Sequence, residues 1–186
     1  MAGVIESLRN DHSRITKLLD ALERQMAAFE DGRSLDFDIL DGILYYCLSY
    51  PDLHHHPLED LIFDRLKERN PGALEGVRDL REEHAALAEK TRKFAAAIES
   101  VEQDIPIERS AIQEVAVEFL SAYRRHIMME EKHFFPAAQR SLKPEDWAAI
   151  GAQLKPIEDP LFERREDQRF SAIYEDIIAW DQASMA

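Results

Sequence analysis

The sequence predicts an all-α protein: an up-down-up-down four-helix bundle with additional C-terminal helices. Apolar residues recur at steps of three and four over four long stretches. Short segments that contain Gly or Pro separate these stretches, as in a bundle with short turns. Hydrophobic residues make up 45% and charged residues 32% of the 186 residues, which is typical of a folded, helix-rich domain.

The first two helices are predicted over residues 4–30 and 37–69. Gly32 and Ser34, in the segment "EDGRSLD", supply the turn between them. Pro51 and Pro57 fall inside the second helix. Because an interior proline removes a backbone hydrogen bond and clashes with the preceding turn, we expect a kink or a short irregularity near 50–57. The apolar face of the first helix comprises Ile5, Leu8, Ile15, Leu19, Leu22, Met26 and Phe29.

The third and fourth helices are predicted over residues 73–102 and 107–140. The segment "NPGALEG" closes the second helix, and "DIPIERS" ends the third at Pro106. The third helix carries Leu80, His84, Leu87, Thr91, Phe94 and Ile98 on one face. The fourth carries Ile112, Val115, Phe119, Ala122, His126, Met129, His133 and Pro136.

A helical extension is expected after the bundle. Pro144 begins a fifth helix that ends near Lys155, and an amphipathic sixth helix lies near the C-terminus. We therefore divide the chain into a bundle, residues 1–142, and an extension, residues 143–186, that packs on the bundle or on a partner chain. The apolar face of the sixth helix comprises Phe170, Ile173, Tyr174, Ile177 and Ile178.

Charge and composition exclude several classes of protein. The formal net charge is −14 and no run of Lys or Arg is long enough to bind nucleic acid. Cys47 is the only cysteine, so no intrachain disulfide can form. The N-terminal residues lack the pattern of a signal peptide, and no apolar run approaches 18 residues. We expect a cytoplasmic protein, monomeric or homodimeric, that binds no nucleic acid and no membrane.

An internal repeat organises the histidines. "LRNDH" at 8–12 recurs as "LREEH" at 80–84, an offset of 72 residues. The pair His55 and Glu59 recurs 71 residues later as His126 and Glu130. Each half therefore contains one helix with a single histidine, followed by one helix with His-x-x-x-Glu.

This pattern predicts a dinuclear metal site inside the bundle. Residues i and i+4 project from one face of a helix, so each His-x-x-x-Glu pair points in one direction. Buried ionised groups are costly unless they are paired or bind metal. Four histidines and two glutamates suit iron and are too many for one tetrahedral zinc, whereas bridging carboxylates fit two ions. The candidate ligands are His12, His55, Glu59, His84, His126 and Glu130.

Several nearby residues leave alternatives open. His56 and Asp60 are also four apart, but only the pair of His55 and Glu59 recurs in the second half. His54 and His56 are 100° to either side of His55 on an ideal helix, and their roles stay open. Glu130-x-x-His133 has no second copy in the sequence, so we assign His133 either to a position next to the ligand residues or to the surface. Tyr123 is assigned to the core, with a redox or hydrogen-bonding role as the alternative. Asp11 and Glu83 are candidate caps, solvated charges or partners of the ligands.

These motifs resemble the hemerythrin-like family, specifically the bacterial HHE cation-binding proteins, over residues 4–140. The resemblance implies a four-helix bundle with two non-heme iron ions and an oxo or hydroxo bridge. It assigns Glu59 and Glu130 as bridging ligands and the four histidines as the remaining ligands. Oxygen-carrying members have another histidine four residues after the third-helix ligand, where this chain has Ala88, and a His-x-x-x-x-Asp motif on the fourth helix.

These departures favour small-ligand or redox chemistry over oxygen carriage. We expect a protein that binds or reacts with O2, peroxide or NO in sensing, defence or redox homeostasis, and leave open whether it turns over as an enzyme. One alternative is a non-enzymatic iron-binding or iron-handling module. Another is an iron–sulfur-cluster repair-type protein, although those usually carry an N-terminal segment with a cysteine, and here the first helix begins almost at once.

Overall fold

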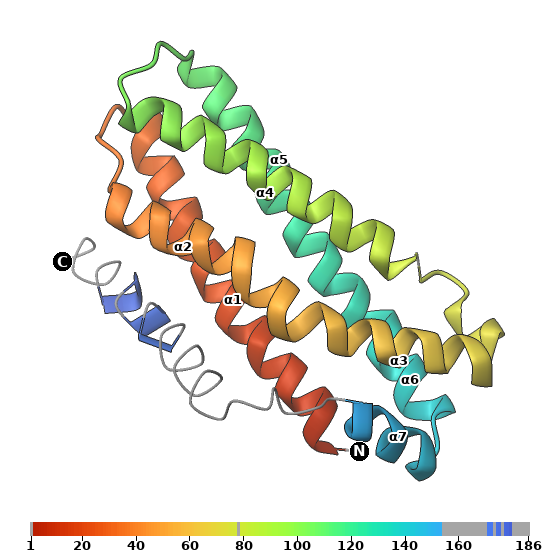
Figure 1. Ribbon diagram of the computed structural model, residues 1–186. Coiled ribbons are helices and arrows are strands. Elements are labelled where there is room, and N and C mark those ends of the chain that lie inside the picture. The colour runs from red at the N-terminus through yellow and green to blue at the C-terminus, as the bar shows by residue number, and fades with distance from the viewer. Residues whose placement is uncertain (1, 78, 154–170, 173, 176, 180–186) are drawn as a thin grey trace.

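The computed structural model describes residues 2–77, 79–153, 171–172, 174–175 and 177–179. These residues form helices and connecting turns, and none of them is in a β-strand. The helices form four rods, which lie side by side along the length of the molecule (Figure 1). The predicted all-α bundle is confirmed.

Two of the rods are single helices and two are interrupted by a π-helical turn. The first rod contacts the second and the fourth, and the third rod contacts the second and the fourth as well, which gives the up-down-up-down arrangement. The rods are α1 (Ala2–Glu30); α2 (Phe37–Tyr50), η1 (Pro51–His55) and α3 (His56–Arg69); α4 (Leu80–Glu102); and α5 (Arg109–Met129), η3 (Glu130–Phe134) and α6 (Phe135–Ser141).

Local sequence explains where the helices begin and end. Gly32 has φ of 87° at the end of α1, and the N–H of Arg33 bonds to the carbonyl of Ala28, so the helix ends in the left-handed turn that glycine favours. The Asp79 carboxylate accepts the N–H of Arg81 and caps α4. The predicted start of this helix at residue 73 was wrong, because Pro71–Leu74 form a separate 3₁₀ turn, η2.

Each π-helical turn ends two residues before a proline. The N–H of His56 bonds to the carbonyl of Pro51, five residues back, and Pro57 follows. The N–H of Phe135 likewise bonds to the carbonyl of Glu130, and Pro136 follows. A widened turn relieves the clash that a proline ring makes with the preceding turn of an α-helix. The irregularity expected near 50–57 is confirmed. The fourth helix, predicted over 107–140, extends over residues 109–141 and contains a π-helical turn that was not predicted.

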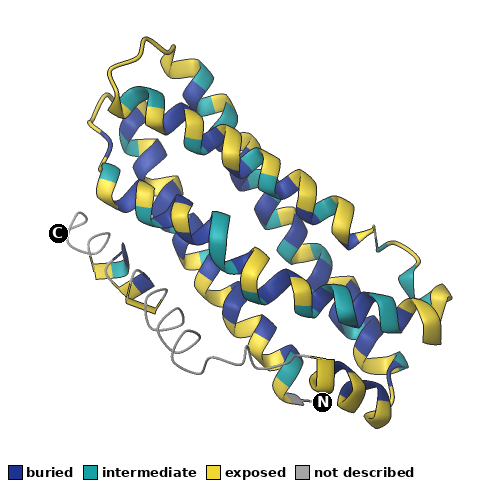
Figure 2. Cartoon of the chain, viewed as in Figure 1, coloured by how far each residue is buried: buried dark blue, intermediate teal, exposed yellow. Residues whose placement is uncertain are grey.

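The hydrophobic core consists of two clusters. One cluster fills the end of the bundle that contains the α1–α2 and α4–α5 turns, and includes Leu22, Ile43 and Phe119. The other fills the opposite end and includes Leu8 and Phe134. The predicted ligands are buried between them, since on every rod they fall between the residues of the two clusters. Buried positions follow the inner faces of the rods along their whole length (Figure 2).

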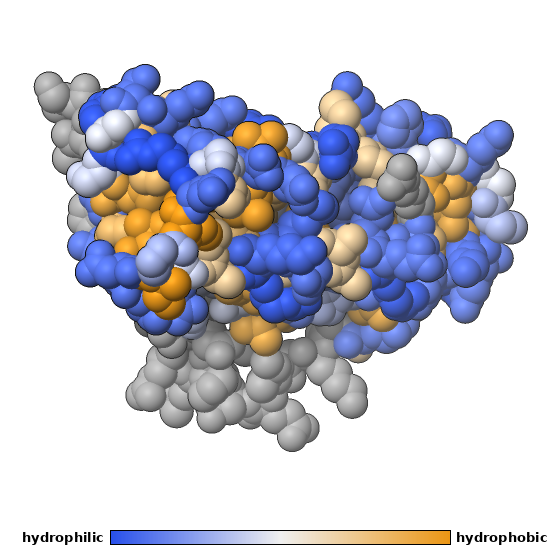
Figure 3. Space-filling view, turned by 90° about the horizontal axis from the view of Figure 1, so that it is seen from above, coloured by the Kyte–Doolittle hydropathy of each residue, from blue (hydrophilic) through white to orange (hydrophobic). Residues whose placement is uncertain are grey.

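The outer surface is mainly hydrophilic, and hydrophobic residues reach it in patches (Figure 3). Large exposed hydrophobic side chains include those of Leu53, Val117 and Met128. In the part of the chain that the structure describes, none of the helices has the length and apolar character required to cross a lipid bilayer.

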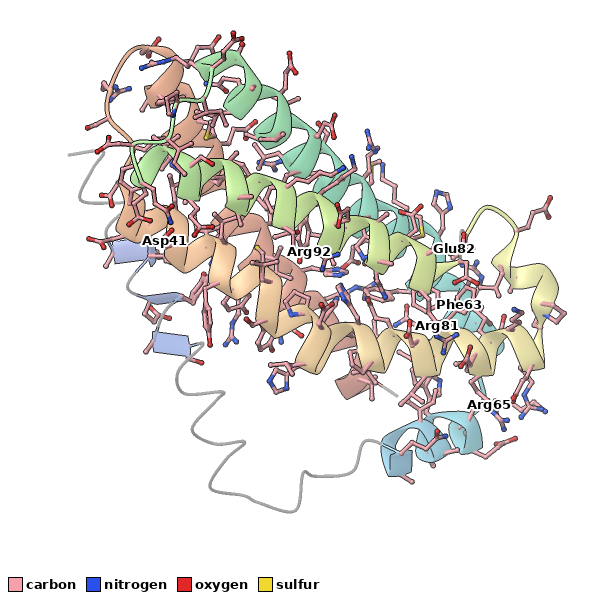
Figure 4. All side chains as sticks on the ribbon, turned by 45° about the horizontal axis from the view of Figure 1, so that its top comes forward. Asp41, Phe63, Arg65, Arg81, Glu82 and Arg92 are labelled. Carbon is pink, nitrogen blue, oxygen red and sulfur yellow. The ribbon has the colours of Figure 1, made fainter. Side chains whose placement is uncertain are left out.

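The extension begins with α7 (Pro144–Gln153), which packs on α3. The buried carboxylate of Asp146 accepts hydrogen bonds from Arg65 and Arg69 of α3 and from the N–H of Lys143. Arg65 extends from α3 toward α7 (Figure 4).

Part of the predicted sixth helix is also described. Tyr174 and Ile177 are buried in the cluster beside α1, with the Arg14 guanidinium over the Tyr174 ring. Phe170, Ile173 and the predicted end of the fifth helix at Lys155 lie outside the described residues. The division of the chain at residue 142 stays a prediction.

Candidate metal centre

Ligand-type side chains from all four rods converge at the middle of the bundle. Imidazole and carboxylate groups gather there in the interior (Figure 4). Their nitrogen and oxygen atoms form two groups, and within each group the ligand atoms lie within 4.8 Å of one another. The first group is His12, His55, Glu59 and Glu130, and the second is His56, Glu59, His84 and His126.

Glu59 belongs to both groups. Its Oε1 lies 3.2 Å from Nε2 of His55, and its Oε2 lies 3.3 Å from Nε2 of His84. The side chain is completely buried. One carboxylate therefore presents an oxygen atom to each half of the site, as a bridging ligand does.

Glu130 occupies the equivalent position on the fourth rod. Its Oε2 lies 3.2 Å from Nε2 of His12, and its Oε1 lies 3.2 Å from Nε2 of His126. It is also completely buried. The two repeat-related glutamates thus face each other's histidines across the centre of the bundle.

The outward nitrogens of four of the five imidazoles face carboxylates, whereas Nδ1 of His126 is buried without a hydrogen-bond partner. An imidazole that donates its Nδ1–H to a carboxylate keeps an unprotonated, inward-facing Nε2, which is the arrangement of a metal-bound histidine. Nδ1 of His12 lies 2.9 Å from Glu131, and Nδ1 of His55 lies 3.2 Å from Asp11. Nδ1 of His56 lies 2.8 Å from Asp52, and Nδ1 of His84 lies 3.5 Å from Asp60. Asp11 also accepts the hydroxyl hydrogen of Tyr50, at 2.9 Å.

Burial and the two glutamates shift the pKa values of the histidines in opposite directions. Burial favours neutral His55, but the charge of Glu59 and the hydrogen bond to Asp11 outweigh it and raise the pKa of His55 to about 10. Burial is likewise outweighed at His84, where the nearby carboxylates of Glu130 and Glu59 raise the pKa to about 9. Burial prevails at His56 and lowers its pKa, despite the hydrogen bond to Asp52.

The carboxyl groups remain ionised. Burial alone would raise the pKa of Glu59, but the charge of His55, 3.2 Å away, holds that pKa well below its ordinary value. Protons on His55 and His84 therefore balance the two glutamates when no cation is bound. A metal ion would replace these protons, so metal binding and proton release are coupled.

The buried polar atoms fit a bound metal. Among the described residues, both oxygens of Glu59 and of Glu130 and the Nε2 atoms of His84 and His126 are buried without a hydrogen bond of acceptable geometry. Nε2 of His12 lies 3.1 Å from Nε2 of His55, so two lone pairs face each other unless one nitrogen is protonated. Such groups are costly inside a protein, and metal ions satisfy all of them at once. The donor set of nitrogen and oxygen suits iron.

The structure brings together all six residues that the sequence singled out as ligands. It also brings in His56, which the repeat did not identify, and pairs it with Asp52 and not with Asp60. His133 is exposed, and Tyr123 is buried in the core against Phe119.

The carboxylates behind the histidines could not be identified from spacing. Asp11 contacts the predicted ligand His55 and not His12, its neighbour in the sequence. Asp52 and Glu131 were not singled out, and Asp60 was considered only as a partner of His56, whereas the structure places it 3.5 Å from Nδ1 of His84.

A small cavity reaches the site between α4 and α5. Its volume is about 150 Å³, and its wall includes His126, Glu83, Ala86 and Ala122, with Lys90 and Arg125. A water molecule occupies roughly 30 Å³ of liquid, so the cavity admits only a few small molecules.

Comparison with known proteins agrees with this geometry. Searches of the curated proteins and of the solved structures found no match. The family model described as the hemerythrin HHE cation-binding domain matches residues 3–138. That range contains the four rods up to Ala138 of α6 and every residue of both ligand groups. The chain belongs to the hemerythrin HHE cation-binding family.

Proposed function

We propose that this protein is a non-heme di-iron protein that binds or reacts with O2, peroxide or NO, in sensing, defence or redox homeostasis. The convergence of two buried ligand groups on a shared glutamate, Glu59, carries the proposal. A single ion would leave one group unsatisfied. Two ions a few ångströms apart, with an oxo or hydroxo bridge, would use both groups.

The protein residues have separate roles in this proposal. Glu59 and Glu130 would bridge the ions, and their charges would offset the charge of the metal. The histidines would bind through Nε2 while carboxylates hold their Nδ1–H groups, which fixes the ring orientation. Bound iron would supply the ability to exchange electrons with a small oxidant.

Size and burial restrict the ligand. The candidate ligands are almost inaccessible to solvent, and the cavity beside His126 is far smaller than the pockets that hold ordinary metabolites. Two- to four-atom molecules such as O2, peroxide and NO meet this limit. The hydrophobic clusters on both sides of the site would keep bulk water away from the ions.

Anaerobic purification tests the proposal directly. Iron would be quantified per chain, and the optical spectrum followed as O2, hydrogen peroxide or NO is added. We expect close to two iron ions per chain and a spectral change with at least one of these ligands. Repeated consumption of peroxide would identify an enzyme, and a stable, reversible O2 adduct would identify a carrier. Failure to retain iron after anaerobic reconstitution would refute the proposal.

A further inference from the structure

The histidine run at residues 54–56 divides into three environments. His55 belongs to the first ligand group, and His56 belongs to the second. His54 lies against the ring of Tyr50, with 5.1 Å between ring centroids, and is in neither group. Consecutive histidines therefore point to different halves of the site.

The π-helical turn makes this division possible. On an ideal α-helix His56 would be turned 100° from His55 and would leave the site. Here the helix widens over Pro51–His55 and resumes at His56, and both side chains are buried, with 2% and 8% exposure. π-Helical turns of this kind often re-aim side chains at functional sites.

The orientation of His56 suits a metal ligand. Its Nδ1 lies 2.8 Å from Oδ1 of Asp52, which leaves Nε2 as its free donor atom. Its ring stacks on that of His84 at 3.8 Å between centroids and 12° between planes, and lies edge-on to that of His126 at 6.0 Å. The stack on His84 and the bond to Asp52 hold the ring where its ligand atom lies within 4.8 Å of those of Glu59, His84 and His126.

We propose that His56 is a fifth nitrogen ligand and that it makes the two metal positions unequal. One position would have His56, His84 and His126, and the other would have only His12 and His55, with the glutamates shared between them. Two histidines with a carboxylate are a ligand set that typically leaves open positions on iron. This inference rests on the proposed di-metal function.

A direct test uses zinc as a diamagnetic probe in the unmodified protein. Imidazole ¹⁵N NMR of the zinc-loaded chain would show which Nε2 atoms bind metal and which rings still titrate with pH. We expect five metal-bound imidazoles, with His54 and His133, which are in neither ligand group, as internal controls that bind no metal. Four metal-bound imidazoles and a titrating His56 would overturn the inference while leaving the di-metal proposal intact. Seven titrating rings would contradict both.

A second test examines the inequality of the positions. With the oxidised iron-loaded protein, azide titration should saturate at one azide per chain. His56→Ala should open the other position, so that a second azide binds, and added imidazole should restore the single-azide behaviour. His54→Ala, which removes the neighbouring ring outside the two groups, should behave as the unmodified protein. Identical azide stoichiometry and no response to imidazole in His56→Ala, relative to His54→Ala, would refute the inequality.

Discussion

Replacing Glu59 by Gln removes one charge from the centre of the site while keeping the size and the hydrogen-bonding capacity of the side chain. Glu59 lies 3.2 Å from His55 and 3.3 Å from His84. A unit charge at that distance interacts with an imidazolium by about 5 kcal/mol at an effective dielectric constant of 20, which corresponds to roughly 3 to 4 pKa units. The raised pKa of His55, about 10 compared with the ordinary 6.5, is of this size.

In the metal-free Glu59→Gln variant we therefore expect the pKa of His55 to fall by about 3 units, into the neutral range. Asp11 still accepts from Nδ1 and prevents a larger decrease. Imidazole ¹⁵N NMR over a pH series measures the change, with circular dichroism to verify the fold. A pKa of His55 that stays near 10 would show that Glu59 is not the source of the shift.

The same variant should lose metal at both positions, because Glu59 is shared by both ligand groups. Glu131→Gln is the matched control, since Glu131 contacts the outward nitrogen of His12 and no predicted metal position. Removing such an outer partner typically weakens metal binding by about 10- to 100-fold. We expect a larger loss for Glu59→Gln, measured by iron content and chelator competition. Equal affinities for the two variants would contradict the bridging role.

Four further predictions concern pH, the core and the extension. Metal must displace protons from His55 and His84, so apparent metal affinity should rise with pH and level off above their pKa values of about 10 and 9; a flat chelator-competition profile from pH 6.5 to 9 would contradict this. In the metal-free protein the same raised pKa values should stabilise the fold fully below pH 6.5, an effect lost as pH rises through 9 and 10, and urea titration would show the opposite trend if the sign were wrong. Phe119→Ala removes a fully buried ring from between Phe94 and Tyr123 and should lower the free energy of unfolding by about 3–5 kcal/mol, whereas a loss below about 1 kcal/mol would refute tight packing there. Asp146→Asn weakens the contacts to Arg65 and Arg69, so amide hydrogen exchange should increase in Pro144–Gln153, and unchanged exchange would mean that other contacts hold α7.

Helical periodicity and the internal repeat were sufficient to predict the rods and six of the residues in the two ligand groups. Both signals depend only on which face of a helix a residue occupies, and that is determined by spacing. His12, His84 and the two His-x-x-x-Glu pairs fall on inward faces for the same reason that their apolar neighbours do.

Spacing could not predict that His56 faces the site, because its direction depends on the π-helical turn that precedes it. A π-helical turn alters the angle between successive residues, and periodicity calculated for an ideal α-helix cannot include it. Pro57 and Pro136 were the available signals, but a proline predicts an irregularity without specifying its form. The carboxylates that face Nδ1 of the histidines could not be predicted for another reason. The chain has 37 acidic residues, and spacing alone does not show which of them contact a histidine.

The position of the metal layer between two hydrophobic clusters has a consequence for folding cooperativity. Each cluster draws residues from all four rods, but the rods cross from one cluster to the other through a layer of charged and imidazole groups. Without metal, that layer is held together by proton-dependent ion pairs, so the coupling between the two ends of the bundle would depend on pH. Bound ions would crosslink the four rods at mid-length, so that both ends unfold as a single unit. Metal in this protein would thus unite two separate cores in addition to any chemistry it performs.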